Sequence, residues 1–170
     1  MDDAEISDRF PTAIWGNTRA CFSGNAMEPE ANDRVDTVLV FVFHELQFLL
    51  ADISSRGWSI PGGRIQDHET PESAVIRETY EETGALLDGI VEIGFYILTE
   101  KFGEVETARR IPVYIARADE IRPMPGGFES RGVTHVSLGE LPGMYYMWDP
   151  LIEAVCNYAH AKALDLAWTL

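Results

Sequence analysis

Three glutamates, Glu78, Glu81 and Glu82, lie within five consecutive residues of the chain. A helix advances by about 100° per residue, so in a helix these carboxylates fall within a single arc of roughly 100°. Crowded carboxylates repel one another, and a divalent cation turns that repulsion into attraction. Hard oxygen ligands of this kind suit Mg²⁺ or Mn²⁺, which proteins hold together with substrate phosphates. The alternative is a solvated acidic helix face, which is what most glutamate-rich helices are.

The residues around the glutamates predict a short helix with defined ends. Thr70 is a suitable N-cap, and Pro71 suits the first helical position. Gly84 can adopt the left-handed conformation that ends a helix. Ile76 and Tyr80 are four residues apart and are expected to anchor the opposite face of the helix to a core.

The spacing of the whole segment from Gly63 to Ala85 favours the metal interpretation. Gly63, Glu69 and the run Arg77-Glu78-Thr79-Tyr80-Glu81-Glu82-Thr83-Gly84-Ala85 resemble the signature of the Nudix hydrolases, in particular the MutT type. Thr79 departs from the family, which usually has an aliphatic residue there, and Ala85 departs more mildly. Both departures affect packing and not ligands. About eight fixed positions make this signal far more specific than a lone glycine motif.

The resemblance implies an α/β fold, a Nudix-like α/β/α sandwich with a mixed β-sheet. It also implies that Glu78, Glu81 and Glu82 hold metal and act in catalysis, with Glu78 the best candidate to orient or deprotonate the water. The Gly63 carbonyl would join them on the metal. Glu69 and Arg77 would form a supporting pair that fixes the loop to the helix, the alternative being a simple surface ion pair.

Other residues carry weaker expectations from the same resemblance. Arg64 matches a position that is often basic and can contact a phosphate, although it is equally well explained as an exposed arginine. The segment 50–52 lacks an arginine often found near there in MutT-type members, and Arg56 could replace it only by a different route. A fourth metal carboxylate is expected from a distant loop, where Glu129 lies six residues before His135. The competing candidates are Glu100, Glu104 and Glu106.

Met147-Trp148-Asp149 resembles the region where some MutT-type enzymes recognise a purine. Trp148 could stack on a base, and Asp149 could accept a hydrogen bond from its edge. The alternative, which is favoured for Asp149, is that Trp148 packs in the core and Asp149 caps a helix that starts at Pro150.

Hydrophobic patterning predicts strands and one further helix around this segment. Residues 36–43 form a nearly continuous apolar run, typical of a central strand that is buried on both faces. Further strands are predicted at 48–52, 58–63, 90–99, 110–118 and 133–138, with loops at 101–107 and 123–127, a turn at 141–143 and a helix at 150–164. Pro112 favours an edge or a bulge. Residues 1–34 are predicted to be an N-terminal extension packing on a Nudix domain at 35–170.

Composition limits the possible partners. The chain of 170 residues has 13 basic and 28 acidic residues and a formal net charge of −15, which disfavours duplex nucleic acid as a partner. The sequence has no apolar run long enough for a membrane span, and its N-terminus lacks the features of a signal peptide. Two cysteines without motif spacing indicate a reducing, cytoplasmic setting. A homodimer is an open alternative to a monomer.

These observations predict a Mg²⁺-dependent pyrophosphohydrolase, with Mn²⁺ as a substitute cofactor. Its expected substrate is a nucleoside triphosphate, with an oxidised purine such as 8-oxo-dGTP as one candidate, cleaved to a monophosphate and pyrophosphate. One alternative is a dinucleoside polyphosphate or capped-RNA pyrophosphohydrolase. Another is a non-catalytic nucleotide-sensing Nudix module, although an intact set of glutamates argues against a pure binder.

Overall fold

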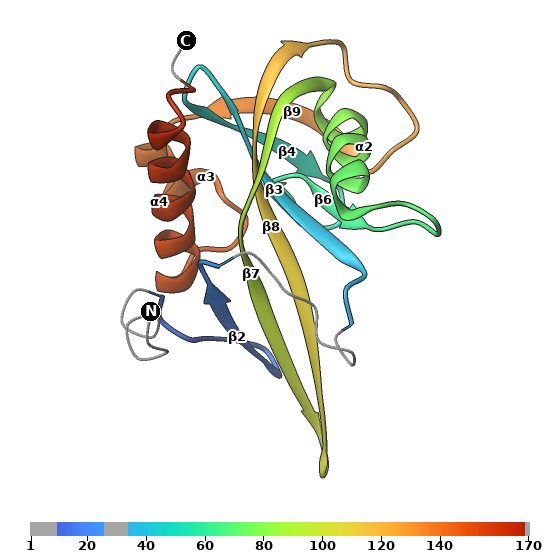
Figure 1. The fold of residues 1–170 in the computed structure, drawn as a ribbon, viewed down its shortest axis with the longest axis vertical. Helices are drawn as coiled ribbons and strands as arrows, with labels where there is room; N and C mark the ends of the chain where they lie inside the picture. The colour runs from blue at the N-terminus through green and yellow to red at the C-terminus, as the bar shows by residue number, and fades with distance from the viewer. Residues whose placement is uncertain (1–9, 26–33, 169–170) are drawn as a thin grey trace.

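The computed structural model describes residues 10–25 and 34–168, which form a mixed β-sheet with helices on both faces (Figure 1). The strands are β1 (Ala13–Trp15), β2 (Thr18–Ser23), β3 (Thr37–His44), β4 (Gln47–Ile53), β5 (Gly57–Ser59), β6 (Gly62–Arg64), β7 (Ala85–Phe102), β8 (Val105–Ile121) and β9 (Ser130–Val136). The helices are α2 (Pro71–Thr83), the 3₁₀ turn η1 (Leu138–Glu140), α3 (Leu141–Met144) and α4 (Pro150–Asp165). The predicted α/β/α sandwich is confirmed.

The sheet runs in the order β1-β2-β7-β8-β3-β4-β5, with β6 paired to β3 and β9 paired to β4. The β3–β8 pair is parallel and the other named strand pairs are antiparallel, so the sheet is mixed. Helix α4 lies along one face of the sheet and α2 lies over the other (Figure 1). The sheet therefore separates two layers of packing.

Strand β3 supplies both layers, as its continuous apolar sequence predicts. Val38, Val40 and Val42 pack with Val75 of α2, whereas Phe41 and Phe43 belong to the core that includes α4. Successive side chains of a strand point to opposite faces, so a central strand that is covered on both sides must be apolar throughout.

Helix α2 begins and ends as predicted, but it buries a different face. Thr70 is the N-cap and accepts a hydrogen bond from Ser73 N, and Gly84 ends the helix with φ 76°. The prediction that Ile76 and Tyr80 anchor the helix is wrong, because they are 51% and 37% exposed. The buried residues are Ala74, Val75, Thr79, Glu82 and Thr83. These residues recur at helical spacing and form one buried stripe. The stripe includes Glu82, which is one of the predicted metal ligands.

Strands β7 and β8 are much longer than predicted. The predicted loop at 101–107 is instead a tight turn between strands that pair from Ala85↔Ile121 to Phe102↔Val105. Their paired ends extend beyond the rest of the described chain (Figure 1). Pro112 does not mark an edge, because β8 lies between β7 and β3. The pairing with β7 is irregular between Glu92 and Gly94, directly beside the Phe95↔Pro112 pair, which agrees with the bulge alternative. The turn predicted at 141–143 is the helix α3.

The described part of the predicted N-terminal extension joins the same sheet. Strands β1 and β2 form a hairpin, and β2 pairs with β7 from Thr18↔Glu100 to Ser23↔Phe95. The Tyr158 hydroxyl of α4 donates to the carbonyl oxygens of Gly24 and Ile93, at 3.0 Å each. Residues 1–9 and 26–33 of the extension lie outside the described residues. Across the described parts of the chain, no helix is long and apolar enough to cross a membrane.

The two buried threonines of α2 give a matched test of how the helix packs. The Thr79 hydroxyl is buried without a hydrogen-bond partner. The Thr83 hydroxyl donates to Thr79 O at 2.6 Å and accepts from Ala85 N at 3.1 Å. We expect Thr79→Val to raise the free energy of unfolding by about 1 kcal/mol, because it removes an unpaired buried polar group.

We expect Thr83→Val to lower the free energy of unfolding by about 1–3 kcal/mol, because it leaves a buried N–H unpaired. Urea denaturation of the two variants beside the wild type checks both signs. Equal losses of stability in the two variants would contradict this account of the helix.

Candidate active site

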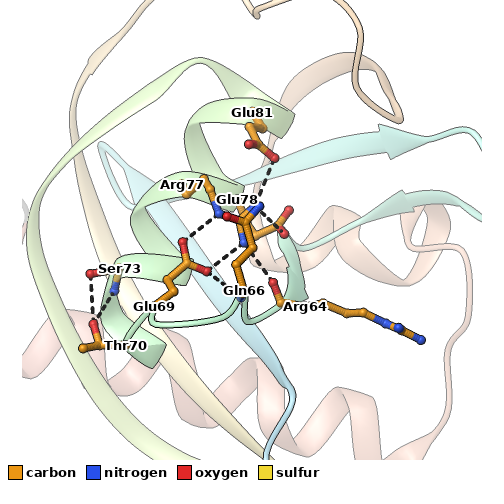
Figure 2. Close-up of polar contacts among 8 residues, drawn as sticks. All are labelled: Arg64, Gln66, Glu69, Thr70, Ser73, Arg77, Glu78 and Glu81. Atoms are coloured by element: carbon orange, nitrogen blue, oxygen red, sulfur yellow. Dashed lines mark hydrogen bonds and ion pairs between the residues drawn. The ribbon is translucent and has the colours of Figure 1, made fainter.

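Arg77 connects the loop before α2 to the glutamates of the helix (Figure 2). Its Nε and Nη2 donate to the two carboxylate oxygens of Glu69 at 2.8 and 2.9 Å. Its Nη1 donates to Glu78 at 2.9 Å and to Glu81 at 3.3 Å, and Nη2 also donates to the Arg64 carbonyl at 2.8 Å. The predicted pairing of Glu69 with Arg77 is therefore present in the structure, in the bidentate geometry that makes such pairs strong.

The contacts with Arg77 and burial shift the pKa values of the residues in this network. Hydrogen bonds from Arg77 and from Gln66 N lower the pKa of Glu69 to about 2. The same contact with Glu69 raises the pKa of Arg77 above its ordinary value. For Glu78, desolvation outweighs the contact with Arg77, and its pKa is raised. The arginine thus holds Glu69 firmly ionised but only partly compensates the burial of Glu78.

Glu82 is the most buried of the three helical glutamates. Its residue is 6% exposed, and its Oε2 accepts a hydrogen bond from Gly62 N at 3.2 Å. Desolvation raises the pKa of Glu82 to about 8, although the Gly62 hydrogen bond and the charge of Arg56 act in the opposite direction. A carboxylate in this position is deprived of water and lacks a full counter-charge.

The glycine pair of β6 lies directly against these carboxylates. A Cβ atom added at Gly63 would lie 2.3 Å from Glu78 Oε1, and one at Gly62 would lie 2.5 Å from Val38 O. A side chain at Gly62 would meet the backbone of β3, and one at Gly63 would displace the Glu78 carboxylate. The Gly63 backbone is therefore close enough to the glutamates to share a ligand with them.

An open cleft of about 460 Å³ collects most of the predicted site residues. It is lined by Arg56, Gly62, Gly63, Arg64, Glu78, Glu81, Glu82, Phe128 and Glu129. Ser54 N donates to Glu129 O at 3.0 Å, which ties the loop that carries Glu129 to the turn that carries Arg56. Of the four candidates for the distant carboxylate, Glu129 is the one in the cleft, while Glu100, Glu104 and Glu106 lie on or between β7 and β8.

The donors in this cleft fit a divalent cation. Among residues 10–25 and 34–168, no three acidic, histidine or cysteine side chains are already arranged to hold a metal ion. Instead, Arg77 forms ion pairs with one oxygen of Glu78 and one of Glu81. The fit rests on the chemistry of the set, which consists of carboxylate oxygens and a nearby backbone, and on the incompletely compensated burial of Glu82. Glu78, Glu81, Glu82 and Glu129 could hold Mg²⁺ or Mn²⁺.

A second, mainly apolar cavity of about 130 Å³ lies between the sheet and α4. It is lined by Trp15, Leu39, Phe41, Arg56, Ser59, Ile60, Tyr96, Leu98, Ile111, Tyr145, Tyr146, Met147, Ile152 and Cys156, and we call it the aromatic cavity. The Tyr146 N–H donates to Trp58 O at 2.8 Å, which fixes the segment that carries the two tyrosines against β5. Between Ile60 of the cavity and Gly62 of the cleft there is a single residue, so the two spaces are neighbours.

Arg56 lines both the acidic cleft and the aromatic cavity. The sequence offers only a weak indication that this residue belongs to the site. It comes from the turn between β4 and β5 and not from the strand, so it does reach the site by a different route. Its Nε donates to Ser59 Oγ at 2.9 Å, and its guanidinium lies 5.8 Å from the centre of the Tyr146 ring. Within the described chain its Nη atoms make no hydrogen bond, so they remain available to a ligand.

Arg64, Trp148 and Asp149 lie differently from one another. Arg64 lines the cleft, with its side chain directed away from the Arg77 network (Figure 2). Trp148 and Asp149 line neither space. Trp148 packs against Tyr145, with ring centres 6.2 Å apart, and Asp149 is the N-cap of α4, accepting from Ile152 N at 2.8 Å. Trp148 therefore packs in the core and Asp149 caps α4, as the alternative interpretation predicts. The aromatic residues that line the cavity are Tyr145 and Tyr146, which shortly precede them in the chain.

Comparison with known proteins agrees with this geometry. Residues 33–153 match the family model of the NUDIX domain. YtkD of Bacillus subtilis, provisionally named an 8-oxo-dGTP diphosphatase, is 31% identical over 96 residues, which cover 56% of this chain and 57% of that protein. A Mycobacterium tuberculosis protein with the same provisional activity is 28% identical over 111 residues, 62% of this chain and 51% of that protein. The matches thus span little more than half the length of these relatives.

Solved structures share the fold. A variant of the Bacillus subtilis pyrophosphohydrolase BsRppH has a TM-score of 0.69 at 21% identity, covering 90% of this chain and 94% of its own. The NUDIX domain of Shewanella oneidensis NrtR, solved with ADP ribose, has a TM-score of 0.60 at 18% identity, covering 76% of this chain and 88% of its own. At these identities the likeness establishes the fold alone.

The burial of Glu82 predicts a pH-dependent stability in the metal-free protein. An unfolded glutamate ionises near pH 4.5, whereas Glu82 in the folded protein does so only near pH 8. Stability is therefore unaffected by this group below about pH 4.5, falls as the pH rises towards 8 and levels off above it, by a few kcal/mol in total at most. We expect Glu82→Gln to be more stable than the wild type at pH 8.5 in EDTA and similar to it at pH 5.

The measurement is thermal unfolding at both pH values, with Glu81→Gln as the control, because Glu81 lies on the same helix with no such burial. Adding Mg²⁺ at pH 8.5 should stabilise the wild type more than Glu82→Gln. A wild-type stability that is flat between pH 5 and 8.5 would contradict the prediction.

Proposed function

Because the chain belongs to the NUDIX domain family, we propose that it is a Mg²⁺-dependent pyrophosphohydrolase that cleaves a nucleoside triphosphate to a monophosphate and pyrophosphate. The observation that carries this proposal is the arrangement of two adjoining spaces with Arg56 on the wall of both. One is an acidic cleft suited to metal and phosphates, and the other is an aromatic cavity suited to a base.

The acidic cleft requires a cation before it can accept a polyphosphate. Glu78, Glu81, Glu82 and Glu129 would repel phosphate oxygens by themselves. These carboxylates and the Gly63 carbonyl would hold a divalent cation, which would supply positive charge to the phosphates and lower the pKa of water. Mn²⁺ can take the same oxygen ligands.

The carboxylates differ in the role that their surroundings allow. Burial raises the pKa of Glu78, and its carboxylate lies against the Gly63 backbone, which supports a role in orienting the attacking water and taking its proton. Glu82 has its Oε2 fixed by Gly62 N, so it is held in a single orientation as a ligand. Glu69 does not line the cleft and acts through Arg77 by fixing the loop to the helix.

Two arginines are available for the phosphates. Arg56 presents its Nη atoms from one turn, and Arg64 presents its exposed side chain directly after the glycine pair. Guanidinium groups match phosphate oxygens in charge and geometry. Because Arg56 also lies beside the Tyr146 ring, it is suited to the phosphate nearest the nucleoside.

The aromatic cavity supports a base as the recognition element. Its volume of about 130 Å³ is well below the roughly 300–1,000 Å³ of pockets that enclose whole drug-sized ligands, so it would take one part of a nucleotide. The names of the curated relatives support 8-oxo-dGTP as the first substrate to test. Trp148, which was a candidate to stack on the base, would then act by supporting Tyr145.

A second candidate substrate is a dinucleoside polyphosphate. Phe128 is 49% exposed and lines the acidic cleft, which gives the cleft an aromatic surface outside the aromatic cavity. A second base could stack there. Homodimerisation and a cytoplasmic location remain predictions from the sequence.

The proposal predicts metal-dependent release of pyrophosphate. We expect turnover of one nucleoside triphosphate in a panel of ordinary and 8-oxo forms with Mg²⁺, its loss in EDTA, and a fall in kcat of at least about a hundredfold in Glu82→Gln. Glu129→Gln should lower the rate or weaken metal binding, whereas Glu104→Gln, at the tip of the β7–β8 hairpin, should not.

Diadenosine polyphosphates belong in the same panel. Activity on these compounds alone would keep the site and change the substrate to the second candidate. Nucleotide binding without turnover of any compound, at saturating Mg²⁺ or Mn²⁺, would instead indicate the non-catalytic module.

A further inference from the structure

One wall of the aromatic cavity comes from outside the region that matches the NUDIX domain. That match covers residues 33–153, whereas Trp15 is the last residue of β1. The half-buried Trp15 side chain lines the cavity together with Tyr96, and their ring centres are 5.8 Å apart. The N-terminal hairpin therefore adds an aromatic surface to a space that the matched domain leaves incomplete.

The hairpin holds Trp15 in a defined place. Trp15 pairs with Thr18 across a turn in which Gly16 has φ 63°, a conformation that glycine adopts without strain. Thr18 in turn pairs with Glu100 of β7, and its hydroxyl donates to the Glu100 carboxylate at 3.0 Å. The backbone of Trp15 is thus tied to the long strand whose Tyr96 and Leu98 form another part of the cavity wall.

The Trp15 ring is oriented by Asp149. The indole Nε1 donates to Asp149 Oδ2 at 2.6 Å, while Oδ1 of the same carboxylate accepts from Ile152 N at 2.8 Å. Hydrogen bonds to a charged acceptor are the stronger kind. Asp149 therefore joins the N-terminal hairpin to the first turn of α4, and α4 supplies Ile152 and Cys156 to the cavity.

We propose that Trp15 is a substrate-contacting residue that stacks on the nucleobase, and that Asp149 is the positioning residue that orients it. This inference rests on the proposed function and assigns the base to a particular surface within it. Stacking uses the π-face that every base has, so it favours a ligand with a base over one without, and it distinguishes poorly between bases. Asp149 does not itself contact the base.

The assignment explains two features together. Trp15 is half-buried, lines the aromatic cavity and has its indole N–H fixed by a carboxylate at 2.6 Å, so its ring is held in one orientation beside the cavity. One oxygen of the Asp149 carboxylate accepts from the indole N–H of Trp15, and the other accepts from the backbone N–H of Ile152. Both oxygens are thus used by the protein, although Met147, two residues earlier in the chain, lines the cavity.

The test compares substrates with and without a base in the 170-residue chain. We expect Trp15→Leu to raise KM for the nucleoside triphosphate by about tenfold to a hundredfold, with kcat changed less than about threefold. The parameters for inorganic tripolyphosphate, or its inhibition constant if it is not cleaved, should stay within about twofold. Trp15→Phe keeps a ring but loses the N–H and should lie between Leu and the wild type.

Asp149→Asn separates positioning from stability. Asparagine is as good an N-cap as aspartate but has a single oxygen, so it can serve Ile152 N or the Trp15 indole and not both. We expect it to raise KM for the nucleoside triphosphate in the same direction as Trp15→Leu, with a fall in unfolding temperature no larger than that of Trp15→Phe, which breaks the same hydrogen bond. Trp168→Leu is the matched control, because Trp168 lies outside both spaces.

The outcomes distinguish this inference from the proposed function. Wild-type turnover with an unchanged KM in Trp15→Leu, or equal losses for the nucleotide and for tripolyphosphate, overturns the role of Trp15 alone. If the wild type turns nothing over but binds a nucleotide by calorimetry, the same comparison is made on Kd, and an unchanged Kd in Trp15→Leu overturns it. A wild type that neither binds nor cleaves any nucleotide overturns both proposals.

Discussion

The site depends on a single guanidinium. All five N–H groups of Arg77 are occupied: two by Glu69, one each by Glu78 and Glu81, and one by the Arg64 carbonyl. Arginine is the residue for this role, because its planar group is always charged and its donors have fixed directions. The loop, the glycine strand β6 and the helix α2 are thereby held as one unit.

The contacts of Arg77 leave the negative charge of the helical glutamates only partly compensated, which suits a metal site. Arg77 neutralises Glu69 fully, reaches one oxygen each of Glu78 and Glu81, and makes no contact with Glu82. The most buried of the three helical glutamates is therefore the one that Arg77 does not reach, and burial raises its pKa. Since burial of a charge is costly unless it is paired, the protein alone leaves this part of the site under electrostatic stress that a cation relieves.

Local sequence patterns predicted much of this architecture. The ends of α2 follow from Thr70, Pro71 and Gly84, because capping depends on a few adjacent residues. The buried face of α2 could not be predicted in the same way: Ile76 and Tyr80 are more apolar than Thr79, yet the sheet packs against Thr79. Tertiary packing decides which stripe of a weakly amphipathic helix is buried.

The site shows the same division. The sequence predicts the acidic set because its spacing along one segment is specific, and Glu129, in a loop before a strand, lines the same cleft. Arg56 and Trp15 reach the site through turns and strand pairing between distant segments, such as β2 with β7, and no local pattern marks such neighbours. Asp149 was correctly favoured as a cap, but its contact with Trp15, 134 residues earlier, was beyond prediction.

The two-sided packing of β3 bears on how this NUDIX fold can diversify. The aromatic cavity draws its walls from the core shared with α4, whereas the glutamate helix rests on the separate core formed with Val38, Val40 and Val42. A side-chain change in one layer is screened from the other by the backbone of the sheet. Side chains of the N-terminal hairpin and of the α4 layer can therefore change in evolution while the layer that carries the glutamates stays as it is.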